Sequence, residues 1–152
     1  MSDDLAHSNP LNTLVNGYWL PTIRAVIALD RNNPAGAIKF LQSAESYELG
    51  AIFTADWAAP LHPVYIRGEA YLRLHQGKKA ATEYQKFVDH WGAVRNSPLG
   101  ALARLGLGRA YAMQGDSEKA HAAYQEFFTL WKDADSDIPI LKRAKAEYAN
   151  LR

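Results

Sequence analysis

The chain contains an internal repeat, and this feature constrains its fold more than any other. Compared with itself at an offset of 40 residues, segment 61–91 matches segment 101–131 at nine positions without a gap. Two unrelated segments of this length and ordinary composition would share about two residues. The repeated residues of the first copy are Gly68, Ala70, Tyr71, Lys79, Ala80, Tyr84, Gln85, Phe87 and Trp91. Such a repeat predicts an array of similar units that bury a common core by stacking.

The apolar residues of each copy have the spacing of one face of an α-helix. In the first copy they lie at i, i+4, i+7, i+8 and i+11, at Ala80, Tyr84, Phe87, Val88 and Trp91. Segment 120–131 repeats this spacing, so each copy predicts one buried helical stripe that includes its tryptophan. A further helical run precedes each stripe, at about 60–75 and 98–114. Each unit is therefore predicted to be a helix, a short turn and a second helix.

Glycines occupy similar places in the two units. Gly68 and Gly108 fall inside the first helical run, where a glycine costs about 1 kcal/mol relative to alanine. We therefore expect them to permit the close approach of a neighbouring helix. Gly77 and Gly115 are predicted to end the first helix of each unit. The candidate N-caps of the helix after the second turn are Asp116 and Ser117.

An earlier, degenerate unit precedes the two copies. Segment 18–30 is predicted to be its first helix, and Pro34 suits the first turn of its second helix. The stripe of that second helix is Ala37, Leu41 and Ala44. The segment Gly50–Ala59, which includes Phe53 and Trp57, is irregular, and its place inside or outside the array stays open.

A final helix is predicted to close the array at its C-terminal end. Asp137 and Pro139 suit the start of this helix. Its apolar face consists of Leu141, Ala144, Tyr148 and Leu151. Its polar face consists of Lys142, Arg143, Lys145 and Glu147. One dry face and one solvated face are what a helix needs to cap a repeat array.

The pattern resembles the tetratricopeptide repeat. In the last unit, Leu107, Gly108, Tyr111, Gly115, Ala120 and Tyr124 stand at that family's signature spacing, as do Gly68, Tyr71, Ala80 and Tyr84 in the middle unit. The period of 40 exceeds the family's usual length of about 34, and Gly77 comes two residues late. The resemblance implies an all-α helical-repeat solenoid of about three helix pairs with a C-terminal capping helix. The expected single domain, 1–152, divides into repeats at about 12–48, 60–94 and 98–133 and a capping helix at about 137–151.

Segments 18–25, 63–72 and 130–151 carry a narrower likeness. They resemble the C-terminal tetratricopeptide region of bacterial serine/threonine protein kinases of the eukaryotic type and of related signalling regulators. The likeness implies a docking or regulatory segment of a larger signalling protein, without the kinase's catalytic motifs. Near the N-terminus, Leu5, Ala6 and Pro10 resemble the end of a preceding repeat, so we expect the chain to derive from a longer array or multidomain protein.

Composition and motifs argue against several classes of function. The formal net charge of +1 provides no broad basic surface for nucleic acid or an anionic membrane. Cysteine is absent and no run of about 18 apolar residues occurs, so thiolate sites and membrane-spanning helices are not expected. The five histidines lack the spacing of metal ligands. We predict a non-enzymatic, cytoplasmic protein without catalytic residues, metal or cofactor.

The residues expected to bind a partner lie in the first helix of each unit. In the family that the chain resembles, these helices line the concave face of the array. This geometry assigns to a partner-binding groove Trp19, Thr22, His62, Tyr65, Glu69, Arg73 and Arg109, with Val26, Leu102 and Leu105 beside them. Aromatic and arginine side chains are frequent in binding hot spots, so the predicted ligand is a peptide or helix of another protein.

Other interpretations of these residues remain open. Trp19 and Leu105 suit core positions as well as a groove, and the charged members suit ordinary ion pairs. An RNA-binding helical repeat would be built from similar units, but it needs a basic groove. A self-associating array would instead use the uncapped N-terminal end.

Overall fold

The computed structural model describes residues 5, 7–50, 61–94 and 97–151, and these residues form helices joined by turns. The principal elements are η1 (Val15–Trp19), α2 (Leu20–Asp30), α3 (Pro34–Leu41), η2 (Gln42–Tyr47), α4 (His62–Arg73), α5 (Gly77–Asp89), α6 (Trp91–Val94), α7 (Pro98–Met113), α8 (Ser117–Leu130) and α9 (Pro139–Ala149). The predicted all-α helical-repeat class is confirmed. The predictions for segment Gly50–Ala59 concern residues that, beyond Gly50, lie outside the described part of the chain.

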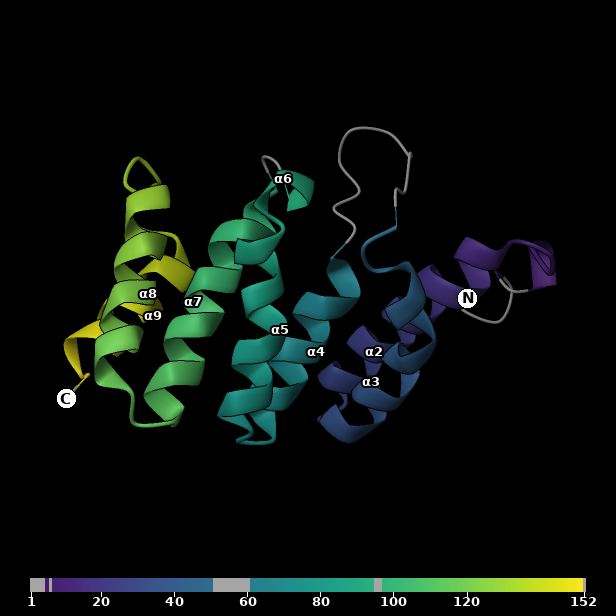
Figure 1. Ribbon diagram of the computed structural model, residues 1–152, viewed down its shortest axis with the longest axis horizontal. Coiled ribbons are helices and arrows are strands. Elements are labelled where there is room, and N and C mark those ends of the chain that lie inside the picture. The colour runs from purple at the N-terminus through teal and green to yellow at the C-terminus, as the bar shows by residue number, and fades with distance from the viewer. Residues whose placement is uncertain (1–4, 6, 51–60, 95–96, 152) are drawn as a thin grey trace.

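The helices lie side by side in one row, with the two ends of the chain at opposite ends of it (Figure 1). Three apolar clusters hold neighbouring pairs together. The first joins α2, α3 and α4 through Ala25, Ala28, Leu29, Ala37, Leu41 and Ala70. The second joins α4, α5 and α7, chiefly through Val64, Tyr84, Phe87, Ala103 and Leu107. The third joins α7, α8 and α9, chiefly through Leu105, Tyr124, Phe127, Leu141 and Ala144. Each helix pair therefore buries its apolar faces against the next, as expected of stacked repeats.

Each first helix ends two residues before a residue with left-handed backbone conformation. These residues are Asn32 after α2 (φ 55°), His75 after α4 (φ 55°) and Gly115 after α7 (φ 76°). After α4, the N–H of His75 donates to the carbonyl of Leu72 (3.0 Å) and that of Gln76 to the carbonyl of Tyr71 (2.9 Å). Equivalent bonds follow α2 and α7, so all three turns are Schellman motifs.

The turn predictions are therefore confirmed for Gly115 and wrong for Gly77. His75 holds the left-handed position of the middle unit, and Gly77 is already the first residue of α5. Gly77 is instead a close-contact residue, because a Cβ atom there would lie 2.8 Å from the carbonyl oxygen of Ala110 on α7. The sequence pattern did not separate these roles, since both favour glycine.

Replacing His75 by glycine should stabilise the protein by about 0.5–1 kcal/mol. Glycine adopts positive φ without the steric cost that a Cβ atom imposes, although its greater freedom in the unfolded chain offsets part of the gain. His75 is exposed, so the substitution removes little packing. Urea unfolding followed by circular dichroism measures the difference. At the equivalent turn, Gly115→Ala should have the opposite sign, and a less stable His75→Gly protein would contradict this account.

Two of the second helices, α3 and α8, begin with a side-chain cap, and the cap of α8 is one of the two predicted residues. Asn33 caps α3 by accepting a hydrogen bond from the N–H of Gly36 (2.9 Å), with Pro34 in the first turn. Asp116 caps α8 by accepting from the N–H of Lys119 (3.2 Å), whereas Ser117 is the first helical residue. At α9 the N-cap position is held by Ile138 without a side-chain hydrogen bond, so Asp137 does not have the predicted role.

The mid-helix glycines accommodate tyrosine rings from the second helices. A Cβ atom on Gly68 would lie 2.7 Å from the Tyr84 ring, and one on Gly108 would lie 2.6 Å from the Tyr124 ring. Gly106 on α7 also faces Tyr84, at 2.5 Å from an added Cβ atom. The close-approach prediction is thus confirmed for Gly68 and Gly108. The ring of Tyr84 is fully buried and contacts both its own first helix and that of the next unit.

The predicted stripes are largely confirmed, with one error at Trp91. Its side chain is 74% exposed, because α5 ends at Asp89 and the backbone leaves the helix at His90. Trp131, its counterpart in the second copy, packs against Phe127 with ring centroids 5.0 Å apart. The stripe of the first unit, Ala37, Leu41 and Ala44, is fully buried. The two tryptophans are therefore equivalent in the sequence repeat but have different surroundings in the structure.

The first-helix surface as a candidate partner-binding site

The residues predicted to bind a partner differ in how far they reach solvent. These residues and Val26 belong to η1, α2, α4 and α7, and we call them together the first-helix surface. Arg73 and Val26 are exposed, and Val26 is exposed over 41% of its surface. The partly buried members are Trp19, His62, Tyr65, Glu69 and Arg109. Thr22 is buried, and its hydroxyl donates to the carbonyl of Tyr18 (2.5 Å).

Two contacts join η1 and α2 to α4 at the N-terminal half of this surface. The rings of Trp19 and His62 meet edge to face, with centroids 6.3 Å apart. Burial lowers the pKa of the His62 imidazole, so this ring is held in its neutral form near pH 7. Arg73 donates from its guanidinium to the carbonyl of Leu29 (2.5 Å), in the last turn of α2. A cation beside the C-terminal end of a helix is favoured by the helix dipole.

At the C-terminal half, the surface is organised by two tyrosine hydroxyls. The hydroxyl of Tyr84 on α5 donates to Glu69 (2.6 Å), and that of Tyr124 on α8 donates to Glu147 on α9 (2.9 Å). Arg109 donates to both carboxylate oxygens of Glu147, at 2.9 and 3.0 Å. A bidentate pair of this kind fixes both side chains. These bonds tie α4 to α5 and α7 to α9.

Burial governs the titration of the tyrosine nearest this network. Tyr65 packs edge to face against Tyr84 and Phe87, with centroids 5.7 and 6.3 Å away. Burial first, and then the neighbouring charge of Glu69, raise the pKa of the Tyr65 hydroxyl. Tyr65 therefore stays a neutral, largely apolar part of the surface.

Glu147 corrects one prediction, because it does not belong to the solvated face of the last helix. It is half-buried and accepts hydrogen bonds from Arg109 and Tyr124. The apolar face of α9 is otherwise as predicted, with Leu141 and Ala144 buried. Tyr84 and Tyr124 occupy equivalent positions in the repeat, and each hydroxyl donates to a carboxylate. This equivalence is the signal in the sequence that could have prompted a search for a glutamate near each ring.

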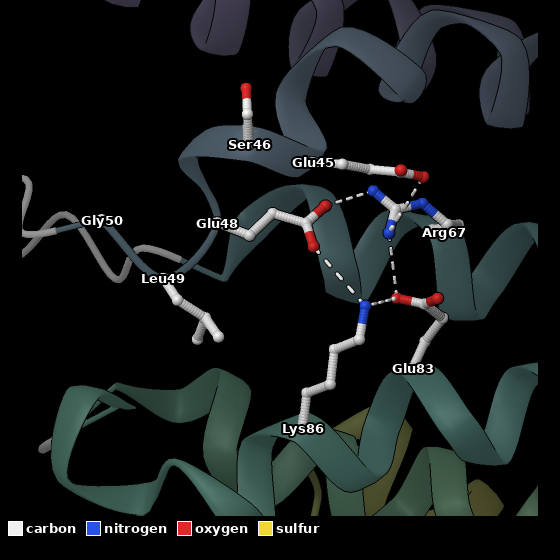
Figure 2. Close-up of a pocket in the computed structure, with 8 residues that line it drawn as sticks. All are labelled: Glu45, Ser46, Glu48, Leu49, Gly50, Arg67, Glu83 and Lys86. Carbon is white, nitrogen blue, oxygen red and sulfur yellow. Dashed lines mark hydrogen bonds and ion pairs between the residues drawn. The ribbon is translucent and has the colours of Figure 1, made fainter.

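A second charged cluster, which the sequence did not single out, lies between η2, α4 and α5 (Figure 2). Arg67 is only 3% exposed and donates to Glu83 (3.1 Å) and, by a short bond, to Glu48. Lys86 reaches the same two carboxylates at 2.9 and 3.5 Å. Glu45 lies at the edge, 4.0 Å from Arg67. We call these five residues the Arg67 cluster.

The Arg67 cluster surrounds a cavity of about 490 Å³, whose lining also includes Ser46, Leu49 and Gly50. The cations and carboxylates there satisfy one another, apart from the Nε of Arg67, which has no hydrogen-bond partner among the residues that the structure describes. Burial by itself lowers the pKa of the Arg67 guanidinium. The hydrogen bond with Glu48 and the charges of Glu83 and Glu48 together outweigh this effect, so the net pKa is raised and the group stays charged. The arrangement is that of a buried ionic joint between the first two units.

The described residues give no support for metal binding or for a membrane-spanning helix. In the part of the chain that the structure describes, no group of three or more His, Cys, Asp or Glu side chains could hold a metal ion. Within the same residues, no helix has the length and apolar character needed to cross a membrane.

A second cavity of about 520 Å³ lies between α8 and α9, lined by Gln125, Phe128, Thr129, Lys132 and Tyr148.

Comparison with known families agrees with this architecture. Residues 63–133 match the tetratricopeptide repeat family. The match runs through α4, α5, α6, α7 and α8, the part of the chain that contains both copies of the repeat. Tetratricopeptide repeats are typically non-catalytic modules that bind other proteins, which supports a protein-interaction scaffold. Neither the curated proteins nor the solved structures compared with this chain gave a match.

Proposed function

We propose that this tetratricopeptide-like array is a scaffold that binds a peptide or helix of a partner protein across the first-helix surface. In this proposal the chain acts as a docking or regulatory segment of a larger signalling protein. The observation that supports it is that aromatic, apolar and charged side chains of the first helices are exposed or partly exposed, and that some of them meet across neighbouring helix pairs. That mixture suits recognition of an extended peptide or an amphipathic helix.

The burial of the surface suggests where contact would concentrate. Val26 and Arg73 reach solvent, and Trp19 and His62, which contact each other, are partly exposed. Tyr65, Glu69 and Arg109 are instead occupied by contacts within the protein, so they would shape the surface more than grip the ligand. We therefore place the main contacts at the N-terminal half, on α2 and α4.

Binding of RNA is less well supported. It would require several unpaired cations along the groove. Arg109 is neutralised by Glu147, and Arg73 is directed at a backbone carbonyl. With a formal net charge of +1, we expect no RNA retention in a filter-binding assay even at low salt. A cytoplasmic location stays a prediction of the sequence alone.

The proposal is tested by affinity capture from a lysate of the source cells. We expect a Val26→Glu, Arg73→Glu protein to lose the partner that the wild type retains, because both changes introduce negative charge at the centre of the proposed contact. A loss of about tenfold or more in retained partner corresponds to one removed hot spot. The bound proteins are identified by mass spectrometry.

A matched control changes charge elsewhere. Lys142→Glu, Lys145→Glu places the same kind of substitution on the exposed face of α9. This control should retain the partner, and both variants should keep the helical circular dichroism of the wild type. Equal retention by all three proteins would show that the first-helix surface is not the binding site.

A further inference from the structure

Helices α2 and α4 can be aligned residue by residue. In this alignment, an exposed face of α2 has residues similar to those with which α4 packs against the preceding unit. The left-handed residues Asn32 and His75 set the register between the two helices at 43 residues. In this register Ile23 and Arg24 coincide with Ile66 and Arg67, an identical dipeptide.

In α4, this face is the joint to the first unit. Ile66 packs against the apolar cluster formed by Ala37, Leu41 and their neighbours, and Ala70 is fully buried in the same cluster. Arg67, between them, bonds to Glu48, which follows the same second helix. The joint therefore combines an aliphatic ridge from α3 with a carboxylate, Glu48, that bonds to the arginine, and a second one, Glu45, at its edge.

In α2, the equivalent apolar positions remain partly open. Ile23 is 36% exposed and Ile27, which coincides with Ala70, is 37% exposed. These isoleucines lie one helical turn apart, so they form one continuous strip with Arg24 beside it. We call Ile23, Arg24 and Ile27 the α2 end face.

On each of the first helices α4 and α7, one position faces the second helix of the preceding unit. The size of the residue at this position indicates which side chain of that second helix can pack against it. On α7 the position equivalent to Ile66 is Gly106, which makes room for the Tyr84 ring of α5. On α4 that position is Ile66, and the preceding helix has Leu41 in place of the tyrosine. The isoleucine at Ile23 therefore matches an aliphatic ridge and leaves no room for a tyrosine.

We propose that the α2 end face docks an amphipathic helix of a partner protein, stacked as a preceding repeat's second helix would be. The chemistry of that helix is set by the joint it would reproduce: small and aliphatic residues spaced like Ala37, Leu41 and Ala44, followed by a glutamate at the place of Glu48. Burial of the isoleucines drives the association, and the glutamate adds a charge pair with Arg24. This surface is distinct from the first-helix surface.

The probe for this site is a synthetic peptide of residues 33–49, fluorescently labelled, with a hydrocarbon staple replacing Lys39 and Ser43. Both positions are exposed in the protein, and the staple preforms a helix that would otherwise be marginal at this length. Fluorescence anisotropy with the full 152-residue protein should show saturable binding. An Ile27→Glu protein should bind about tenfold more weakly or worse, because it buries an unpaired charge in the joint.

Two controls separate the α2 end face from other surfaces. Val26→Glu introduces the same charge on the neighbouring residue of α2, at the edge of the α2 end face, and should weaken peptide binding much less than Ile27→Glu does. A stapled peptide of residues 76–90, which carries the ridge of Tyr84 and Phe87, should bind much more weakly than the 33–49 peptide. Charge exchange supplies the third arm: Arg24→Glu should weaken binding of the wild-type peptide and restore binding of a peptide with Glu48→Arg.

Several results would overturn the proposal. Absence of saturable binding, binding unaffected by Ile27→Glu, or equal binding of the two peptides would each do so. If light scattering shows a dimer that Ile27→Glu dissociates, a second copy of this chain occupies the face instead. Because Val26→Glu and Ile27→Glu report mainly on different surfaces, failure here leaves the test of the proposed function intact.

Discussion

An Arg67→Met protein should lose about 3–5 kcal/mol of unfolding free energy. The substitution keeps much of the side-chain volume but removes the cation between Glu48 and Glu83, both of which are buried with it. Lys86 remains as the neighbouring cation, yet it is more exposed and already bonded to Glu83. Two carboxylates would then share one partner in a poorly solvated site. Urea unfolding followed by tryptophan fluorescence and circular dichroism measures the loss.

Two companion proteins identify the cause. Arg104→Met removes an arginine whose partner, Glu126, is 59% exposed, so we expect a loss below about 1 kcal/mol. Adding Glu48→Gln and Glu83→Gln to Arg67→Met removes the uncompensated charges and should recover much of the stability. A loss for Arg67→Met as small as that for Arg104→Met would show that the Arg67 cluster contributes little to the joint.

Gly106→Ala should destabilise the protein by about 1–3 kcal/mol, against the usual preference of helices for alanine. The added Cβ atom would lie 2.5–2.7 Å from three atoms of the Tyr84 ring. That ring also contacts Gly68 and is held by the bond from its hydroxyl to Glu69, so it has little freedom to move away. The clash must therefore displace α7 from α5. Thermal and urea unfolding measure the change.

Gly92→Ala is the matched control, because none of the described residues has an atom within 4 Å of the added Cβ atom. It should be neutral or slightly stabilising. Tyr84→Leu combined with Gly106→Ile would recreate at this joint the leucine and isoleucine found at Leu41 and Ile66. The two substitutions together should be less costly than the sum of their separate effects by about 1–3 kcal/mol. Simple additivity would show that the ring and the glycine are not coupled.

The repeat made most of the fold predictable. Helical spacing is a local property, so the stripe at Ala37, Leu41 and Ala44, the first-turn position of Pro34 and the cap at Asp116 followed from neighbouring residues. The close approach at Gly68 followed because glycine inside a helix is costly without a packing reason.

The errors have a common origin. Trp91 occupies a repeated position, but a change of backbone direction at His90 turns it to solvent. Gly77 was assigned to a turn whose left-handed residue is His75. In both cases the residue type is compatible with two backbone conformations. Which conformation the chain adopts depends on contacts with other units.

The candidate site shows the same division. Register within the repeat placed Trp19, His62 and Arg73 on the first helices, and their contacts join η1 and α2 to α4. It could not show that Arg109 meets Glu147, which is 38 residues away, or that Arg67 is buried among glutamates from two units. The sequence alone determined the helices, their pairing and their apolar faces, because these depend on residues within about two turns of one another. Only the tertiary structure decided which charges are buried and which side chains reach solvent, because those outcomes depend on how separate helix pairs stack.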